Sequence, residues 1–296
     1  MKEKIKKKYR QTYRNIIKHL PCKVVLNIEN LRGYHKFINF KHPKYFGEKI
    51  QWLKVYGNLE RYTDYADKYK VREYISKKIG EQYLIPLLQV CDKPEQIDYD
   101  SLPDKFVIKL NTGSGYNIII DDKNIIDKTE VSKKLNKWLK EDYYKIKKEV
   151  QYKNIDKKIL CEGFVNDQSG QLLDYKFFCF DGSVEFVQVD YDRFGTHMRN
   201  FYDRNGNLLD LQCGDYLIKK DADSLPNNYS DMIRLSQLLS KDFRFVRVDL
   251  YDVDEKIYFG ELTFTPTGGL KPFKPIEKDI EYAKKIKVSD VDEKKN

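Results

Sequence analysis

Lysines and glycines in the first half of the sequence have a spacing suited to holding phosphate. Lys109 lies in a strand-like segment at 105–110, and a glycine turn at 112–116 leads from it into a second strand-like segment at 117–120. Glycines let backbone N–H groups reach phosphate oxygens, and a lysine on a strand supplies a fixed positive charge. The turn lacks the ending of a Walker A loop and the third glycine of a dinucleotide-binding fingerprint. An ordinary hairpin turn is therefore the alternative to a phosphate grip.

Two carboxylates in the last fifth of the sequence are candidates to hold a metal ion. Asp249, in Arg247-Val-Asp249, and Glu261, in Gly260-Glu261-Leu-Thr263, lie on consecutive strand-like segments. Side chains on paired antiparallel strands can face one another, and close carboxylates need a cation between them. Oxygen ligands suit Mg²⁺, which also bridges substrate phosphates. An exposed acid pair is the alternative, although the apolar residues around both carboxylates favour burial.

Other charged side chains could complete such a site. Lys68 stands at the start of an expected helix, Lys176 lies on a strand-like segment, and Arg193 and Arg199 flank the end of the next one. Such cations could neutralise a transferring phosphoryl group or hold a substrate carboxylate. A solvated helix face for Lys68 and a surface ion-pair network for the others are the alternatives. His197 accompanies them, but the sequence shows no Ser-His-Asp or Cys-His arrangement.

The elements that must position these residues are both helices and strands. Hydrophobic periodicity predicts a basic helix within 1–20, a packed helix within 40–60, and helices at 64–78, 131–148 and 229–239. Alternation predicts strands at 84–90, 105–110, 117–120, 159–165, 172–180, 184–190, 245–251 and 256–264. Asp181-Gly182 is a hairpin signal. This mixture predicts an α+β fold rather than a doubly wound parallel sheet, followed by a helix that fades into a charged tail at 277–296.

Charge is concentrated at the N-terminal end of the chain. Residues 1–20 hold eight basic side chains and one acid, so the rest contributes little to the net charge of +9. A general nucleic-acid-binding surface is therefore disfavoured. No apolar run approaches the roughly 20 residues of a membrane helix, and no secretory signal is readable. Five widely spaced cysteines without a CxxC pair indicate a reducing compartment. We expect a cytoplasmic protein whose basic N-terminus could contact an anionic inner-membrane surface.

Taken in order, these elements resemble an ATP-grasp enzyme, and in particular the TupA-like ATP-grasp family, named for teichuronopeptide biosynthesis. Its motifs are similar to four segments: Phe46-Gly-Glu-Lys-Ile-Gln-Trp52, Ala66-Asp-Lys-Tyr-Lys-Val-Arg72, Asp174-Tyr-Lys-Phe-Phe-Cys-Phe-Asp-Gly182 and Phe259-Gly-Glu-Leu-Thr-Phe264. The resemblance spans roughly 46–275. It implies ATP and Mg²⁺ as cofactors and a nucleotide held between two subdomains.

The resemblance also implies roles for individual residues. Lys68 and Lys109 would bind phosphate, and Asp249 and Glu261 would hold Mg²⁺ beside Arg247. Thr263 stands where the family usually has Asn, and its hydroxyl can still offer an oxygen to Mg²⁺. The phosphate flap would comprise Thr112, Gly113, Ser114 and Gly115, and the adenine-lining backbone would comprise Glu162, Gly163, Phe164 and Val165.

The activity that the resemblance implies is ATP-dependent ligation of an amine to a carboxylate through an acyl phosphate. The acid would be a hexuronate of a capsular or cell-wall polysaccharide or of its precursor. Lys176 would cover phosphate charge, and Arg193 and Arg199 would hold the carboxylate. A phosphotransferase on the same scaffold, a glycosyltransferase using an Asp-x-Asp motif such as Asp190-Tyr-Asp192, and a non-enzymatic polyanion-binding protein are the alternatives.

The expected organisation has four parts. A basic helical extension at 1–45 precedes a helical and linker region at 46–104. The ATP-grasp core covers 105–276, with one subdomain at about 105–160 and the other at about 161–276. The charged tail follows at 277–296.

Overall fold

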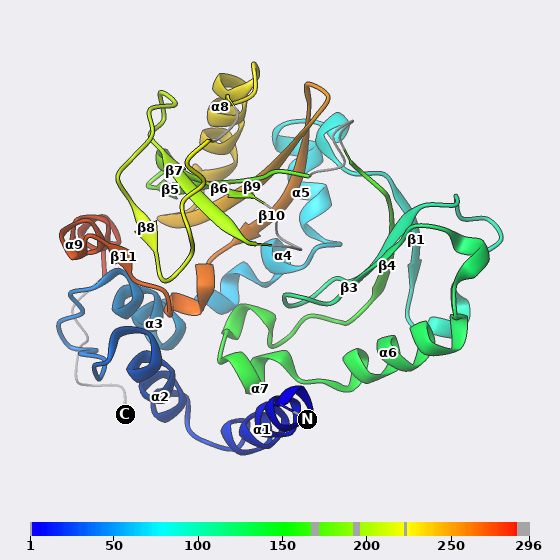
Figure 1. The fold of residues 1–296 in the computed structure, drawn as a ribbon, viewed down its shortest axis with the longest axis horizontal. Coiled ribbons are helices and arrows are strands. Elements are labelled where there is room, and N and C mark those ends of the chain that lie inside the picture. The colour runs from blue at the N-terminus through cyan, green and yellow to red at the C-terminus, as the bar shows by residue number, and fades with distance from the viewer. Residues whose placement is uncertain (1, 167–171, 192–195, 222–223, 289–296) are drawn as a thin grey trace.

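The computed structural model describes residues 2–166, 172–191, 196–221 and 224–288. Two antiparallel sheets stand side by side, each with its own helix, and helices from the N-terminal part run along one side of both (Figure 1). This mixture of helices and antiparallel strands confirms the predicted α+β class. No helix among the described residues is both long and apolar enough to cross a membrane.

The first sheet has four strands in the order β1-β4-β2-β3. Its strands are β1 (Leu87–Cys91), β2 (Phe106–Leu110), β3 (Asn117–Ile120) and β4 (Ile159–Gly163). Helix α6 (Lys128–Lys140) packs Leu135 against the buried residues Phe106 and Ile108 of β2. Successive side chains of a strand point to opposite faces, so burial of these two residues turns Lys109 away from the core. Strand β1 of this sheet lies in the expected helical and linker region at 46–104, and β4 continues past residue 160, the expected end of the first subdomain.

The second sheet has five strands in the order β10-β9-β5-β6-β7. Its strands are β5 (Asp174–Phe180), β6 (Ser183–Tyr191), β7 (Met198–Tyr202), β9 (Phe245–Val253) and β10 (Lys256–Thr263). Helix α8 (Tyr229–Ser240) covers one face, where Leu235 joins the cluster of Val246 and Val248. The other face holds a phenylalanine cluster with Phe178 and Phe186. Beside that cluster, the same face carries polar residues.

Local sequence explains the turns of this sheet. Asp181 and Gly182 join β5 to β6 with φ values of 46° and 79°. Two consecutive positive φ values are typical of the tightest hairpin loops, so the predicted hairpin is confirmed. Asp254 and Glu255 make the equivalent turn between β9 and β10 with φ values of 49° and 65°.

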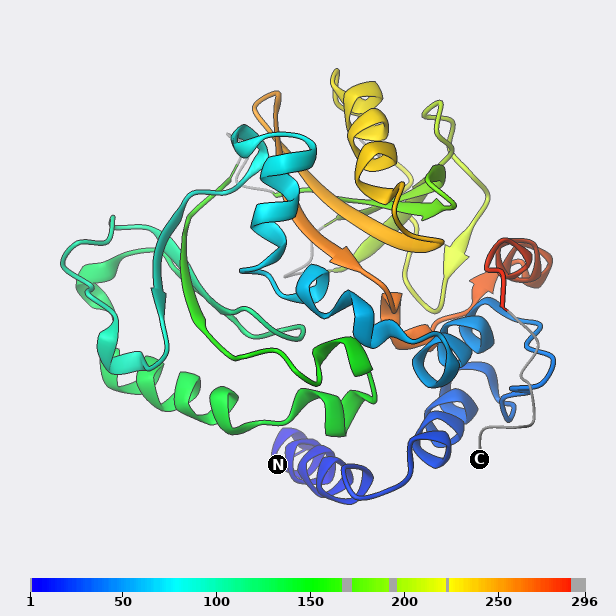
Figure 2. The same ribbon diagram turned by 180° about the vertical axis from the view of Figure 1, so that it is seen from behind.

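Two predicted helices are each interrupted, and in both cases an aspartate is the reason. The segment 64–78 forms α4 (Thr63–Ala66) and α5 (Val71–Lys78), because the carboxylate of Asp67 accepts hydrogen bonds from the backbone N–H groups of Tyr69 and Lys70. The segment 131–148 forms α6 and α7 (Tyr143–Lys147), and Asp142 caps α7 through the N–H of Lys145. Asp142 thus caps the N-terminus of α7, and Asp67 binds backbone donors of the turn that precedes α5. Figure 2 shows α4 and α5 between the two sheets.

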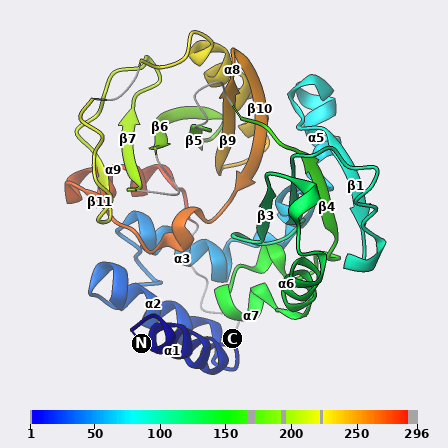
Figure 3. The ribbon, with the colours of Figure 1, turned by 45° about the vertical axis from the view of Figure 1, so that its right-hand side comes forward.

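Both ends of the described chain meet along one side of the molecule. The N-terminal helices are α1 (Lys2–Ile17), α2 (Cys22–Tyr34) and α3 (Phe46–Tyr56), and α1 lies below α3 and α7 in Figure 3. Helix α9 (Ile276–Lys285) packs against α3. The carboxylate of Asp279 in α9, fully buried, accepts hydrogen bonds from the N–H groups of Phe46 and Phe273 at 2.7 and 2.8 Å.

The segment expected to fade into a tail therefore begins as an anchored helix, and residues 289–296 lie outside the described part. The sequence did not predict three short strands. Strand β7 forms one edge of the second sheet, and the two-residue strands β8 (Gln212–Cys213) and β11 (Phe273–Lys274) pair with each other. Short 3₁₀ turns lie at Leu59–Tyr62, Glu81–Tyr83, Pro94–Gln96, Lys123–Ile125, Val150–Tyr152 and Pro266–Gly269.

Candidate active site

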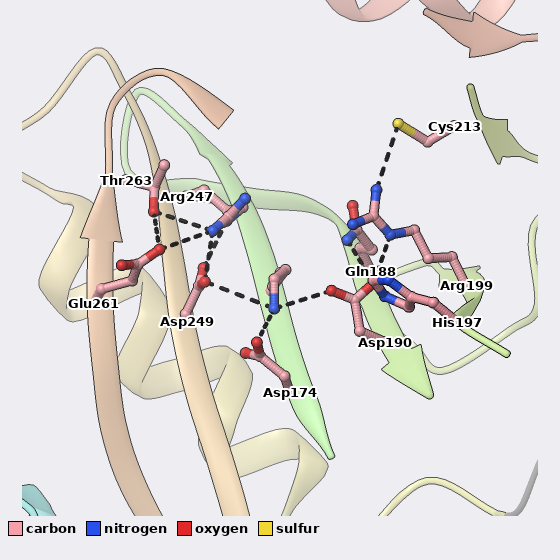
Figure 4. Close-up of polar contacts among 11 residues, drawn as sticks. Asp174, Gln188, Asp190, His197, Arg199, Cys213, Arg247, Asp249, Glu261 and Thr263 are labelled. Carbon is pink, nitrogen blue, oxygen red and sulfur yellow. Dashed lines mark hydrogen bonds and ion pairs between the residues drawn. The ribbon is translucent and has the colours of Figure 1, made fainter. Parts of the chain in front are cut away.

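A row of charged side chains crosses one face of the second sheet. Glu261 on β10 pairs with Asp249 on β9, Asp249 pairs with Lys176 on β5, and Lys176 pairs with Gln188 on β6. Register partners of neighbouring strands point to the same face. Strand register thus brings together residues that are up to 85 positions apart in the sequence. Figure 4 shows the resulting network from Glu261 to Arg199.

Asp249 and Glu261 were expected to have a cation between them. In the structure the guanidinium of Arg247 contacts both carboxylates. Its Nε and Nη2 donate hydrogen bonds to Oδ1 and Oδ2 of Asp249, each at 2.6 Å. Its Nη2 also lies 3.1 Å from Oε1 of Glu261 and 3.1 Å from Oγ1 of Thr263. The hydroxyl of Thr263 donates to Glu261 at 2.7 Å. Arg247, Asp249, Glu261 and Thr263 therefore form one connected group, as the sequence predicted.

The charges of this group act on one another. Burial raises the pKa of Asp249 and outweighs the opposing effect of Arg247. Burial acts in the same direction on Glu261, but there Lys68 and Arg247 prevail and hold the pKa at about 2. Glu261 is therefore an ionised carboxylate at neutral pH.

Lys176 links this group to a second one. Its ammonium contacts the carboxylate of Asp174 and lies 3.2 Å from Asp190 and 3.8 Å from Asp249. Its side chain is 6% exposed, so this charge is balanced inside the protein by three carboxylates. The family resemblance implied that Lys176 would cover phosphate charge. In the structure its contacts are to aspartates, which position it beside Asp249.

The second group surrounds Asp190. Its Oδ1 accepts a hydrogen bond from Nε of Arg199 at 2.6 Å and lies 3.3 Å from Nε2 of His197. The guanidinium of Arg199 stacks over the ring of Tyr216 at 3.6 Å. Burial disfavours the charge of Asp190, but Lys176 and Arg199 overcome this and hold its pKa well below the usual value. Arg199 is thus engaged by Asp190. Arg193, also predicted to bind substrate, lies outside the described residues.

A narrow cleft separates the two sheets beside this network. Lys68, Arg72, Lys109 and Glu162 line it from one side, and Phe259 and Gly260 of β10 line it from the other. Nζ of Lys109 lies 2.5 Å from Glu162, and Arg72 lies 3.7 Å from the same carboxylate. The volume left between these side chains is about 10 Å³, room for a single water molecule.

This cleft contains both predicted phosphate lysines. Lys68 donates a hydrogen bond to the carbonyl oxygen of Gly113 in the glycine turn at 2.6 Å. Burial lowers the pKa of Lys68, an effect that the nearby Glu261 opposes. With Lys109 paired to Glu162, the cleft has no room for a nucleotide. Glu162 was expected to contribute only backbone groups. The sequence analysis therefore missed the ion pairs of its carboxylate with Lys109 and Arg72.

The glycine turn has the backbone that its sequence requires. Gly113 and Gly115 adopt φ values of 71° and 80°. A side chain at Gly113 would meet the ring of Tyr143 at 2.7 Å, whereas nothing lies within 4 Å of one at Gly115. The turn is therefore packed at its first glycine and open at its second. Thr112 is buried, and Ser114 faces the larger cavity described below.

Asn111 ties this turn to the break between α4 and α5. Its side chain is fully buried, and Nδ2 donates to Oδ1 of Asp67 at 3.0 Å. The carbonyl oxygen of Asn111 accepts a hydrogen bond from the N–H of Lys68 at 2.8 Å. The interruption of the helix thus fixes Lys68 next to the glycine turn. The sequence analysis did not single out Asn111, although an amide beside a glycine turn is a usable signal.

The remaining predicted residues lie at the end of β4. Gly163 ends that strand, and its N–H donates to the carbonyl of Pro86 at 2.9 Å. Phe164 and Val165 follow directly and are half-buried. The expected adenine-lining stretch therefore borders the same side of the cleft as Glu162.

A larger cavity of about 750 Å³ is lined by the residues of β10 that follow those of the narrow cleft. Arg247, Glu261, Thr263 and Ser114 line it at the candidate site. Phe259 and Gly260 line the cleft while Glu261 and Thr263 line this cavity, so successive residues of β10 border both spaces.

The donor atoms at this junction fit Mg²⁺ in kind. Asp249 and Glu261 offer carboxylates and Thr263 offers a hydroxyl. Within the described ranges, no group of three or more His, Cys, Asp or Glu residues could hold a metal ion. Mg²⁺ takes one or two protein carboxylates and completes its shell with phosphates and water.

A comparison with known protein families identifies the class of this chain. A family model described as TupA-like ATP-grasp matches residues 48–287. The chain therefore belongs to the TupA-like ATP-grasp family, as its motifs indicated. No curated protein matches the sequence significantly.

Solved structures also resemble the chain. D-alanine–D-alanine ligase from Helicobacter pylori is 16% identical, with 82% of this chain and 69% of that chain covered and a TM-score of 0.42. The same enzyme from Bacillus anthracis, complexed with ATP, is 16% identical over 68% of this chain and 53% of that chain, with a TM-score of 0.41. An N5-carboxyaminoimidazole synthase from Aspergillus clavatus is 11% identical over 68% and 44%, with a TM-score of 0.40. The chain thus spans about half the length of the last two proteins.

Proposed function

We propose that this protein is an ATP- and Mg²⁺-dependent ligase that joins a carboxylate to an amine, with a hexuronate of a polysaccharide or its precursor as the acid. The observation that carries the proposal is the double role of β10. Its residues 259–260 border the lysine-lined cleft, and Glu261 and Thr263 border a cavity large enough for a second substrate. Arg247 lines this cavity beside Glu261.

The reaction consists of two displacements. A carboxylate oxygen of the substrate attacks the γ-phosphorus of ATP, the bond to the bridging oxygen breaks, and ADP leaves. The amine nitrogen then attacks the acyl carbon, phosphate leaves with the former carboxylate oxygen, and the nitrogen loses a proton. Positioning and charge neutralisation dominate such transfers.

The residues of the site divide this work. Lys68 and Lys109 bind the phosphates of ATP, and the glycine turn that carries Gly113 covers them. Arg247 neutralises charge on the transferred phosphoryl group. Asp249 and Glu261, with Thr263, would hold Mg²⁺, whose positive charge would help to neutralise the phosphate oxygens.

Trapping with hydroxylamine tests this proposal. The full chain is incubated with ATP, Mg²⁺, hydroxylamine and each of a panel of hexuronates and amino acids. We expect a hydroxamate from a hexuronate, with one ADP and one phosphate released per hydroxamate. Lys109→Gln should abolish the product and Lys105→Gln, an exposed neighbour, should leave it unchanged.

Other products would contradict the proposal. A stable phosphate ester without hydroxamate would show a phosphotransferase. A hydroxamate from amino acids alone would retain the ligase and exclude the hexuronate. Binding of a sugar nucleotide without ATP turnover would favour a glycosyltransferase, although Asp190 of its candidate motif is already bound to Arg199 and Lys176.

We also propose that the basic N-terminal segment contacts anionic lipid in the cytoplasm. Its support is the eight basic residues among positions 1–20. Co-sedimentation with phosphatidylglycerol vesicles tests it. Salt-sensitive binding to these vesicles and none to phosphatidylcholine vesicles is expected, and equal behaviour with both would contradict it.

A further inference from the structure

The N-terminal helices form a wall of the large cavity. Tyr9, Tyr13 and Arg14 of α1 and Glu29 and Arg32 of α2 line the same space as Arg247 and Glu261. All five residues precede residue 48, where the match to the family model begins. This wall is therefore an addition to the part that defines the family.

Aromatic rings and guanidinium groups alternate on this wall. The guanidinium of Arg32 lies over the ring of Tyr13 at 4.4 Å, and its Nη2 donates to the hydroxyl of Tyr9 at 3.1 Å. Tyr13 donates to Glu29, which lies 3.8 Å from Arg32. These contacts hold the rings of Tyr9 and Tyr13 nearly parallel, at 15°. A stack of this kind is a preformed surface for a ring-shaped ligand.

The charge of the cavity favours an anion. Five cations line it, at Arg14, Arg32, Lys54, Lys147 and Arg247, against three carboxylates, at Glu29, Glu149 and Glu261. Lys54 pairs with Glu149 at 3.6 Å, and Arg247 pairs with Glu261. Lys147 makes no hydrogen bond or ion pair with the described residues, and Arg14, whose side chain is 48% exposed, pairs with Glu141 outside the cavity lining.

From these observations we propose that α1 and α2 bind the distal part of the acid substrate, and that this substrate is an acidic saccharide of more than one ring. The inference rests on the proposed ligase. The carboxylate to be activated lies at Arg247, while Arg14 and Arg32 bind further carboxylates and Tyr9 and Tyr13 lie against sugar rings. A planar guanidinium matches a carboxylate in geometry, and the volume of 750 Å³ lies in the upper part of the roughly 300–1,000 Å³ found for small-molecule sites.

Binding measurements on the full chain test this inference. Trigalacturonate is the acidic probe, monomeric galacturonate the one-ring probe and chitotriose the neutral probe, each titrated calorimetrically. We expect Arg14→Gln and Arg32→Gln each to weaken trigalacturonate binding about tenfold, as loss of one charge-assisted hydrogen bond does. Binding of monomeric galacturonate and of a non-hydrolysable ATP analogue should not change.

Lys8→Gln is the matched control, because Lys8 is an exposed cation of the same helix that does not line the cavity. It should bind trigalacturonate like wild type. If Arg32→Gln fails to fold, the independent Arg14→Gln still decides the matter.

Three results would overturn the inference. They are unchanged trigalacturonate affinity in both arginine variants, equal affinity for chitotriose, and loss of phosphatidylglycerol-vesicle binding in Arg14→Gln with trigalacturonate binding intact. The last would assign these residues to lipid. Failure of the proposed ligase activity would give a different result from failure of this inference. No hydroxamate would form, but Arg14→Gln would still weaken trigalacturonate binding.

Discussion

Arg247 and Asp249 lie two positions apart on β9, on the same face of the sheet, and are joined by two parallel hydrogen bonds of 2.6 Å. Both side chains are almost completely buried. Such a fork places a guanidinium at one fixed orientation, from which its Nη2 also reaches Glu261 and Thr263. The pair therefore sets the position of the charge that we assign to the transferred phosphoryl group.

Removal of one member of this pair should destabilise the fold. In Arg247→Met the carboxylate of Asp249 stays buried near Asp174 and Glu261, and an uncompensated buried charge costs about 3–5 kcal/mol. In the double variant Arg247→Met with Asp249→Asn, part of that loss should be recovered. Urea unfolding of Arg247→Met, Asp249→Asn and the double variant measures the coupling, and strictly additive effects would contradict the assigned pair.

Nucleotide affinity should depend on Lys109 and not on its neighbour. Lys109→Gln removes a charge from the cleft and should weaken binding of a non-hydrolysable ATP analogue about tenfold or more, since a hydrogen bond to a charged group contributes about 1.5–3 kcal/mol. Lys105→Gln changes an exposed residue just outside β2 and is the control. Equal affinity in the two variants would place the nucleotide elsewhere.

Glu261 should make the nucleotide complex dependent on Mg²⁺. In wild type, Mg²⁺ added with the ATP analogue should raise the melting temperature above the value with the analogue alone. In Glu261→Gln this increment should disappear, because an amide replaces a charged ligand. Thr263→Asn, which installs the residue usual in the family, should retain it. A full increment in Glu261→Gln would contradict the metal assignment.

The stabilising effect of Asp190 should disappear in acid. Its pKa in the folded protein lies below the usual 3.8, so its contribution to the free energy of unfolding is complete above that value and declines as pH falls toward the folded-state pKa. The stability difference between wild type and Asp190→Asn should therefore be largest near neutrality and shrink below about pH 4. Denaturant unfolding at several pH values measures it.

The exposed Asp121 provides the control for this titration. Asp121→Asn should show a small, nearly constant difference from wild type over the same range. A difference for Asp190→Asn that grows in acid would mean that Lys176 and Arg199 do not stabilise the ionised carboxylate.

The two glycines of the phosphate turn should differ in their tolerance of alanine. Both adopt positive φ, so each substitution strains the backbone, at a cost of about 1 kcal/mol. Gly113→Ala also drives a methyl group against Tyr143 at 2.7 Å and should cost more, whereas Gly115→Ala meets no atom within 4 Å. Thermal unfolding ranks them, and a larger loss for Gly115→Ala would contradict the packing of this turn.

Local patterns predicted most strands, because alternation and turn chemistry act over a few residues. The positive φ values at Asp181 and Gly182, for example, follow from the residues themselves. The helix breaks at Asp67 and Asp142 were not predicted, since an aspartate inside a periodic apolar stripe carries no sign that its carboxylate will cap a new helix. Strand β7 was missed because its sequence, Met-Arg-Asn-Phe-Tyr, does not alternate between apolar and polar residues.

At the candidate site, the sequence predicted which residues lie there better than it predicted which side chains they contact. Arg247, Asp249, Glu261 and Thr263 were grouped correctly because two adjacent strands carry them. Lys176 was given a phosphate role, but strand pairing sets it among Asp174, Asp190 and Asp249. The cavity wall from α1 and α2 was unpredictable, since it depends on how distant helices pack.

Transfer of oxygen from the acid to phosphate tests the central claim most directly. A hexuronate labelled with ¹⁸O in its carboxylate is incubated with the protein, ATP, Mg²⁺ and an amine, and the released phosphate is analysed by mass spectrometry. Activation of the carboxylate as an acyl phosphate predicts one ¹⁸O atom in each phosphate released with amide formation. Amide accompanied by unlabelled phosphate, or phosphate release without amide from any hexuronate, would contradict the account.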